Sequence, residues 1–98
     1  MTITERKEGS VLTLVVEGRL DTTTSPELDA RIEGMDADVT SLILDCAGME
    51  YISSSGLRVL LKAQKLMNAR GSMKLTGVID MVREVFDVTG FSDILTVE

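Results

Sequence analysis

The 98-residue chain contains no histidine and no tryptophan, a single cysteine, a single proline and only three aromatic side chains. The lack of histidine excludes a Ser-His-Asp triad and any histidine-ligated metal site. With one cysteine the chain cannot form an intrachain disulfide, and residues 1–7 lack the apolar core of a signal peptide, so we expect a cytoplasmic protein. No apolar run approaches ~18 residues, so we expect no membrane insertion.

The net charge limits the possible partners, and the apolar content indicates a single hydrophobic core. The formal net charge is −6, which disfavours nucleic acid and anionic membrane surfaces as partners. The apolar content of 44% is enough for one hydrophobic core, which must be aliphatic because aromatics are scarce. We therefore expect a single domain over residues 1–98, with no cofactor and no metal.

Strand-like and helix-like segments alternate along the chain without linkers or repeats. Strands are predicted over residues 2–7, 11–17, 42–45 and 73–76, and helices over residues 25–35, 56–67 and 78–88. The apolar strand 11–17 should lie near the centre of the sheet, and residues 91–97 should return to the sheet or pack on its edge. The predicted fold class is α/β, a single-domain sandwich with a small mixed sheet of about four to five strands and three to four helices packed on it.

Local signals place the first and last helices. The first should begin at Thr24 or Ser25, with Pro26 in its first turn and Thr24 and Glu27 at capping-box spacing. Its apolar face would be Leu28, Ile32 and Met35. The last helix is predicted to turn the following side chains inward: Val78, Met81, Val82, Val85 and Phe86.

Three serines and a glycine, Ser53-Ser54-Ser55-Gly56, precede the middle helix. A helix N-terminus offers unpaired N–H groups and a dipole that favours negative charge. Serine is also a preferred N-cap residue, so two interpretations stay open. The serines either cap the helix or include an acceptor for a phosphate, which this position would tolerate.

The middle helix is apolar over most of its circumference. Its apolar residues would be covered by a neighbouring helix or the C-terminal segment, or they form a patch that docks a partner. A basic stripe runs along the same helix at Arg58, Lys62 and Lys65. This stripe is either a solvated face or a surface that a partner contacts.

Four stretches resemble a known family: Gly18-Arg19-Leu20-Asp21, Leu44-Asp45, Tyr51-Ile52-Ser53-Ser54-Ser55-Gly56-Leu57 and Val82-Arg83-Glu84-Val85-Phe86-Asp87-Val88-Thr89-Gly90-Phe91. Together, in this order and spacing, they resemble a stand-alone STAS domain, and within that group the chain is most similar to bacterial anti-sigma-factor antagonists. The resemblance covers nearly the whole chain.

The resemblance implies a phosphorylation switch. In that family the unphosphorylated protein binds an anti-sigma factor, which is a serine kinase, and thereby releases a sigma factor. The kinase phosphorylates a serine before the middle helix, and a serine phosphatase reverses the modification. Ser54 matches the acceptor, Gly56 the family's glycine and Asp21 an aspartate near the switch. The family has an acidic residue where this chain has Ser53, so Ser53 or Ser55 could replace Ser54 as the acceptor.

The partner-binding surface implied by the resemblance comprises Asp21, Thr22, Ser53, Ser55, Gly56, Leu57, Arg58 and Lys62. We expect a non-enzymatic protein that is a monomer or weak dimer. An alternative within the same fold is an accessory subunit of a membrane transporter or lipid-trafficking complex, which would dock without phosphorylation. A small serine hydrolase is disfavoured because the chain has no histidine and little room for a substrate pocket.

Overall fold

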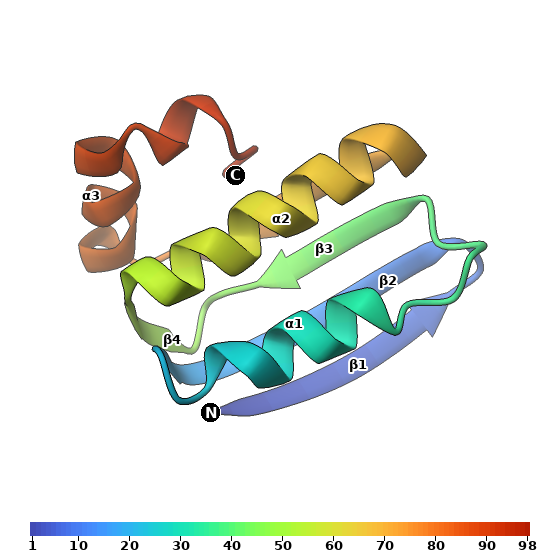
Figure 1. Ribbon diagram of the computed structural model, residues 1–98, viewed down its shortest axis with the longest axis horizontal. Coiled ribbons are helices and arrows are strands. Elements are labelled where there is room, and N and C mark those ends of the chain that lie inside the picture. Colours follow the sequence, from blue (N-terminus) through green and yellow to red (C-terminus); the bar gives the residue numbers. More distant parts are fainter.

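The computed structural model describes residues 1–98 as a mixed sheet with helices on one side and at one end (Figure 1). The strands are β1 (Thr2–Glu8), β2 (Val11–Leu20), β3 (Ser41–Asp45), β4 (Met49–Ile52) and β5 (Ser72–Thr76). The helices are α1 (Ser25–Glu33), α2 (Ser54–Arg70) and α3 (Asp80–Thr89), followed by the short 3-10 helix η1 (Phe91–Asp93). The predicted fold class is confirmed.

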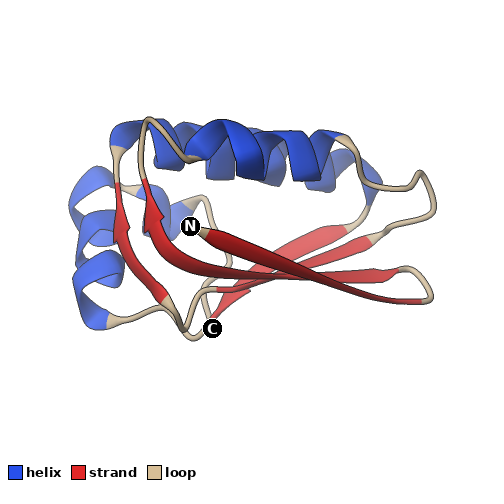
Figure 2. Ribbon diagram, turned by 90° about the horizontal axis from the view of Figure 1, so that it is seen from below, coloured by secondary structure: helices blue, strands red, loops and turns tan.

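Strand β2 is the centre of the sheet, as predicted. The strand order is β1-β2-β3-β5, with β1 antiparallel to β2, and with β3 parallel to both β2 and β5. The end of β2 leaves this sheet and pairs in parallel with β4. The change occurs at Gly18, whose φ of +100° suits glycine, and at a register shift between Gly18 and Arg19. Figure 2 shows the resulting upward bend of the strands.

Strand β4 corrects the sequence-based prediction, which had a loop between β3 and α2. Its four residues, Met49-Glu50-Tyr51-Ile52, show no alternation in burial, because the two outer residues are buried and the two inner ones are exposed. Such a short run lacks the period-2 signal by which strands are found. β2 is also longer than predicted, since it continues through Gly18 to Leu20.

Helices α1 and α2 cover one face of the sheet, and the opposite face has no helix on it (Figure 2). The covered face presents alternate residues of the central strands, including Leu12, Leu14 and Val16 of β2 and Leu42 and Leu44 of β3. The core is aliphatic, as expected, with Phe86 the one fully buried aromatic side chain. None of the helices is long and apolar enough to span a bilayer.

Helix α1 begins at the predicted N-cap, Thr24, but the predicted capping box does not form. The Thr24 hydroxyl donates to the carbonyl of Arg19 at 2.7 Å and makes no side-chain cap hydrogen bond. The helix ends at Glu33, before Met35, which is half-buried against the core from the loop beyond.

Helix α2 begins at Ser54, two residues earlier than predicted, and much of its surplus apolar surface is buried. Leu57, Leu60, Ala63 and Met67 belong to the core, and Val59 and Leu66 pack against it while partly exposed. α1 lies alongside α2 on the same face of the sheet (Figure 1). Burial within the protein therefore accounts for part of the surplus, while Val59 and Leu66 keep part of their surface exposed.

Helix α3 stands at the β4 end of the molecule and packs against β4 (Figures 1 and 2). Val82 and Phe86 face the core as predicted. Met81 does not, because 60% of it is exposed, so its predicted inward orientation is wrong. After η1, Leu75 and Val97 form a parallel bridge, which places the C-terminal residues on the β5 edge, one of the two predicted outcomes.

Candidate functional site

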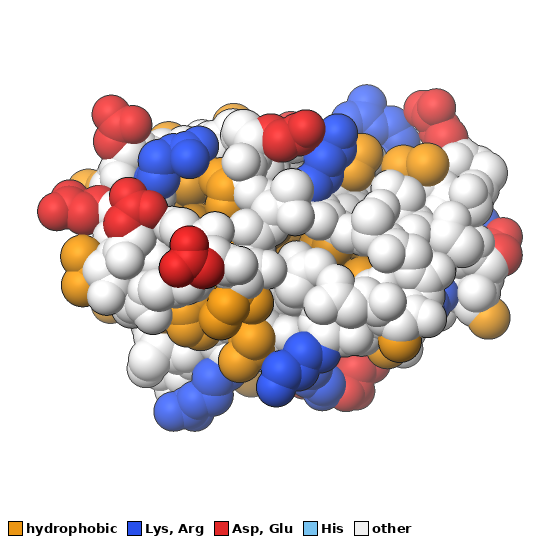
Figure 3. Space-filling view, turned by 90° about the horizontal axis from the view of Figure 1, so that it is seen from above, with side chains coloured by type: hydrophobic (Ala, Val, Ile, Leu, Met, Phe, Trp, Pro, Cys, Tyr) orange, Lys and Arg blue, Asp and Glu red, His pale blue; other side chains and the backbone are white.

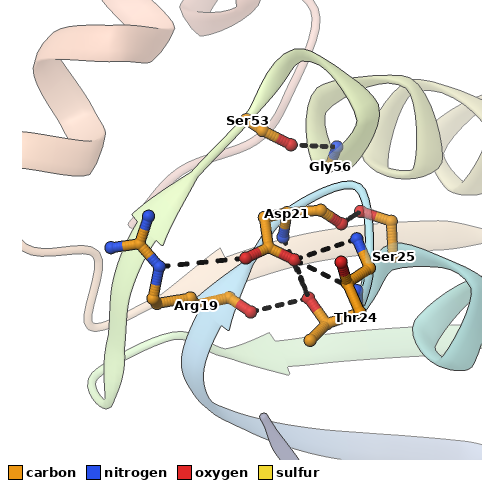
Figure 4. Close-up of polar contacts among 7 residues, drawn as sticks. Arg19, Asp21, Thr24, Ser25, Ser53 and Gly56 are labelled. Atoms are coloured by element: carbon orange, nitrogen blue, oxygen red, sulfur yellow. Dashed lines mark hydrogen bonds and ion pairs between the residues drawn. The ribbon is translucent and has the colours of Figure 1, made fainter.

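Ser53 links β4 to α2 and is the N-cap of the helix. It has extended backbone angles, and its hydroxyl accepts a hydrogen bond from the N–H of Gly56 at 3.3 Å (Figure 4). The Ser53 N–H donates to the carbonyl of Leu20 at 2.9 Å, which ties the helix start to the end of β2. The capping interpretation therefore holds for Ser53. Serine and aspartate are about equally good N-caps, so the departure from the family's acidic residue keeps the cap.

Ser55 faces the loop that joins β2 to α1. Its hydroxyl lies 3.2 Å from that of Thr22, close enough for a hydrogen bond. The structure thus brings together two residues that the sequence predicted for one surface, although they are 33 positions apart.

Ser54, the first residue of α2, differs from both neighbouring serines. It is exposed, whereas Ser53 and Ser55 are half-buried, and its hydroxyl takes part in none of the hydrogen bonds within the protein. The N–H groups of Ser54 and Ser55 have no backbone acceptor, because the first helical bond runs from Leu57 to the carbonyl of Ser53. An exposed hydroxyl therefore lies beside unpaired N–H groups at the positive end of a helix.

Gly56 brings the first turn of α2 very close to the strands. A Cβ atom at this position would lie 2.8 Å from Cγ1 of Ile52 and 2.9 Å from the carbonyl oxygen of Leu20. Leu57 follows and is buried in the core. Both residues position the serines from beneath, and neither presents a side chain to solvent.

Asp21 organises the turn between β2 and α1. Its Oδ1 accepts hydrogen bonds from the N–H groups of Thr23 and Thr24 at 3.0 and 3.1 Å (Figure 4). The pKa of Asp21 lies below its usual value, chiefly because its carboxylate accepts a hydrogen bond from the N–H of Thr24. Hydrogen bonds from the Thr24 hydroxyl and the Thr23 N–H, and the charge of Arg19, lower this pKa in the same direction. Its ordinary role as a turn residue is thus realised here.

Arg19 and Tyr51 form a contact that the sequence did not predict. They are paired across β2 and β4, and the Arg19 guanidinium lies 4.2 Å from the centre of the Tyr51 ring. Arg19 Nε is also 3.8 Å from Asp21 Oδ2. Both residues lie in the stretches that resemble the family, but their pairing depends on β4, which the sequence did not reveal.

The basic stripe of α2 divides into two kinds of residue. Lys62 forms ion pairs with Glu33 and with Asp29 of α1, the latter at 3.1 Å, and its pKa is raised mainly by the hydrogen bond to Glu33. Arg58 and Lys65 are exposed and take part in none of the ion pairs. Arg58, one turn from the serines, is therefore available to a partner, whereas Lys62 joins the two helices.

The site presents its serines on the surface and not in a pocket. The three hollows on the molecule are lined by other residues, and no cluster of acidic or cysteine side chains suited to a metal is present. Two loops and a helix N-terminus instead form one continuous surface of hydroxyls and charges. Such a surface is suited to binding another protein.

Known proteins resemble this chain in sequence and in fold. The sequence model of the STAS domain matches residues 2–98. The chain is 33% identical over 99 residues to BtrV of Bordetella bronchiseptica, named as an anti-sigma factor antagonist, and the match covers 99% of this chain and 85% of BtrV.

Two solved structures have the same fold. An anti-sigma factor antagonist from Mycobacterium paratuberculosis has a TM-score of 0.87 at 22% identity, covering 98% of this chain and 83% of that one. The phosphorylated form of the Bacillus cell fate determinant SpoIIAA has a TM-score of 0.77 at 19% identity, covering 99% of this chain and 91% of that one. At these identities the likeness shows the fold.

Proposed function

Because the chain belongs to the STAS family, we propose that it is a regulatory binding protein whose partner is an anti-sigma factor. The unphosphorylated protein binds that factor, a serine kinase, and so releases a sigma factor. Phosphorylation at Ser54 ends the complex, and a serine phosphatase restores the binding form. The name of the relative BtrV, an anti-sigma factor antagonist, supports this role.

One observation favours Ser54 over its neighbours as the acceptor. A kinase needs an accessible hydroxyl, and Ser54 is the exposed serine whose hydroxyl has no partner within the protein. The hydroxyl of Ser53 is occupied by the N–H of Gly56, and that of Ser55 lies against Thr22. Phosphorylation of either neighbour would disturb a contact that holds the site together.

A phosphate on Ser54 would alter the surface more than the fold. It adds about 1.5 to 2 negative charges at pH 7. The unpaired N–H groups of Ser54 and Ser55 and the helix dipole favour that charge locally. A partner surface that fits the neutral hydroxyl would instead meet a bulky dianion, which explains how one modification separates the proteins.

The partner would contact the surface around this serine. Thr22 and Ser55 hold the adjoining loop, Arg58 offers an exposed cation, and Lys62 lies farther along the helix. Asp21 holds the turn between β2 and α1, and Ser53 holds the connection between β4 and α2. Gly56 and Leu57 let the first turn of α2 pack closely on the strands.

The test maps phosphate on the peptide that contains Tyr51 to Arg58, from protein isolated from its native cells. We expect phosphate on Ser54, its loss in Ser54→Ala, and its retention in Ser53→Ala. A phosphate that survives Ser54→Ala and disappears in Ser53→Ala would refute the assignment. A loop that stays unmodified under all growth conditions would favour a docking module that works without phosphorylation.

A matched pair of charged variants tests the switch itself. Ser54→Asp should weaken binding to the cognate anti-sigma factor at least about tenfold, because the charge lies in the contact surface. Ser53→Asp adds the same charge one residue earlier, at an N-cap where aspartate is well accepted, and should retain binding. Equal loss in both variants would mean that any added charge disrupts the surface.

A further inference from the structure

The exposed large hydrophobic side chains are concentrated at one end of the molecule. They are Tyr51 of β4, Ile79 before α3, Met81 and Val88 of α3, and Ile94 after η1. Figure 3 shows this face, where hydrophobic side chains over α3, at the left, lie among acidic ones. Scattered apolar residues on a surface need no explanation, but a gathered set marks an interaction site.

Helix α3 has two apolar stripes, and only one of them is fully buried. Val82 and Phe86 face the core. Met81, Val85 and Val88 follow the spacing i, i+4 and i+7 on another side of the helix, where Met81 and Val88 are 60% and 80% exposed. Val85, between them, is partly buried and packs against the core, so the exposed part of this stripe is formed by Met81 and Val88.

This second stripe forms a shallow hollow. Met81, Glu84, Val85, Val88 and Thr89 line a space of about 320 Å³ along the helix. Three of these side chains are apolar, while Glu84 contributes a carboxylate and Thr89 a hydroxyl. Methionine adapts its shape to different partners, so Met81 suits a surface that receives another protein's side chains.

The charges around the hollow select among possible occupants. Residues 79–94 carry Asp80, Glu84, Asp87 and Asp93 against the single cation Arg83, a net charge of −3. A second copy of this acidic chain would bring two such surfaces together, and an anionic membrane would be repelled in the same way. A segment with apolar residues on one side and Lys or Arg beside them complements both the stripe and its rim.

We propose that the outer surface of α3, formed by Met81, Val85 and Val88 with Glu84 at its centre, binds a basic amphipathic helix of a partner protein. The apolar face of that helix lies along the stripe, since both repeat with the helical period, and its Lys or Arg residues pair with the acidic rim. This binding surface belongs to α3, so it operates whether or not the switch at Ser54 exists.

The test uses the full chain labelled with ¹⁵N and a synthetic helical peptide of about 18 residues, with Leu on one face and Lys on the other. We expect saturable binding with amide shifts concentrated in residues 79–94. A peptide with Glu in place of every Lys should not bind. Shifts concentrated elsewhere, or equal binding of the Glu peptide, would overturn the proposal.

Paired variants separate the stripe from net charge. Met81→Lys with Val88→Lys changes two exposed positions, so the protein should fold, and it should weaken peptide binding at least tenfold. Ala37→Lys with Ala69→Lys adds the same charge at exposed positions elsewhere and should weaken binding much less. Equal weakening of peptide binding by both pairs would overturn the proposal. It would also be overturned if sedimentation showed that the wild type is a dimer and that Val88→Lys converts it to a monomer.

Discussion

Gly56 brings the first turn of α2 close to the strands that lie beneath Ser53, Ser54 and Ser55. In Gly56→Ala the new Cβ would lie 2.8 Å from Cγ1 of the buried Ile52 and 2.9 Å from the backbone oxygen of Leu20, and the oxygen cannot move without shifting the strand. We expect the free energy of unfolding to fall by about 1–3 kcal/mol, the range for overpacking a core. Urea unfolding measures this change.

A second glycine provides the control. In Gly48→Ala the Cβ would also meet an atom at 2.8 Å, but that atom is Cγ of Glu17, on an exposed and flexible side chain. The side chain can turn away, so the free energy of unfolding should stay near that of the wild type. Equal destabilisation in the two variants would show that proximity to the sheet is not what requires glycine at position 56.

Asp21 should make stability depend on pH. Its pKa is lowered in the fold, so its carboxylate contributes stability above the unfolded pKa of about 3.9, and that contribution is lost as pH falls through the lower pKa of the folded protein. Asp21→Asn keeps an oxygen acceptor but no charge. We expect it to be less stable than the wild type at about pH 7, with the difference closing below about pH 4. Unfolding followed over a pH series tests this, and a constant difference would contradict it.

At the scale of the elements, two of the basic residues of α2 have different expected roles. Arg58→Glu should weaken binding to the anti-sigma factor and leave the melting temperature unchanged, since Arg58 takes part in none of the ion pairs. Lys62→Glu should lower the melting temperature, because it places a carboxylate against Asp29 and Glu33 of α1. Calorimetry and binding measured on both variants test the division.

Lys65→Glu serves as the control for these two substitutions, since Lys65 is exposed on the same helix and unpaired. Neither its melting temperature nor its affinity should change much. If Arg58→Glu left the affinity unchanged, Arg58 would lie outside the interface.

The sequence predicted those elements whose signals are long and local. The apolar run of β2 and the unbroken helix-forming residues of α2 identified both elements, and the serines were correctly placed at the start of α2. β4 was missed because four residues carry no readable period. Met81 was placed inward because the periodicity of α3 does not say how far round the helix the buried face extends.

The candidate site was predicted as a set of residues but not as a geometry. Family resemblance brought Asp21 and the serines together, whereas the contact of Thr22 with Ser55 and the stacking of Arg19 on Tyr51 depend on how β2 bends and on β4. Ion pairs between α1 and α2 likewise require the packing of two helices, which a single sequence does not specify.

At the scale of the whole molecule, the C-terminal segment closes the β5 edge of the sheet. Leu75 donates its N–H to Thr96 and accepts from Glu98, both at 2.9 Å, and Leu95 is buried beside them. Leu95→Ala should lower the free energy of unfolding by about 2–5 kcal/mol, as for other buried leucines. The neighbouring Ile94→Ala, at a half-exposed side chain, should change it little, and equal effects would mean that the segment is not anchored through Leu95.

The pairing of β2 with both β3 and β4 has a consequence for the order of events during synthesis. β2 leaves the ribosome with only β1 as a partner, and its two parallel partners, β3 and β4, follow after α1. Parallel pairings of this kind form slowly because a long loop must close first. Ser53 comes directly after β4, so both strands that lie beneath the serines are synthesised before them, whereas the rest of α2 follows. A kinase that recognises the folded surface would therefore have no target until α2 has been synthesised and has packed on these strands.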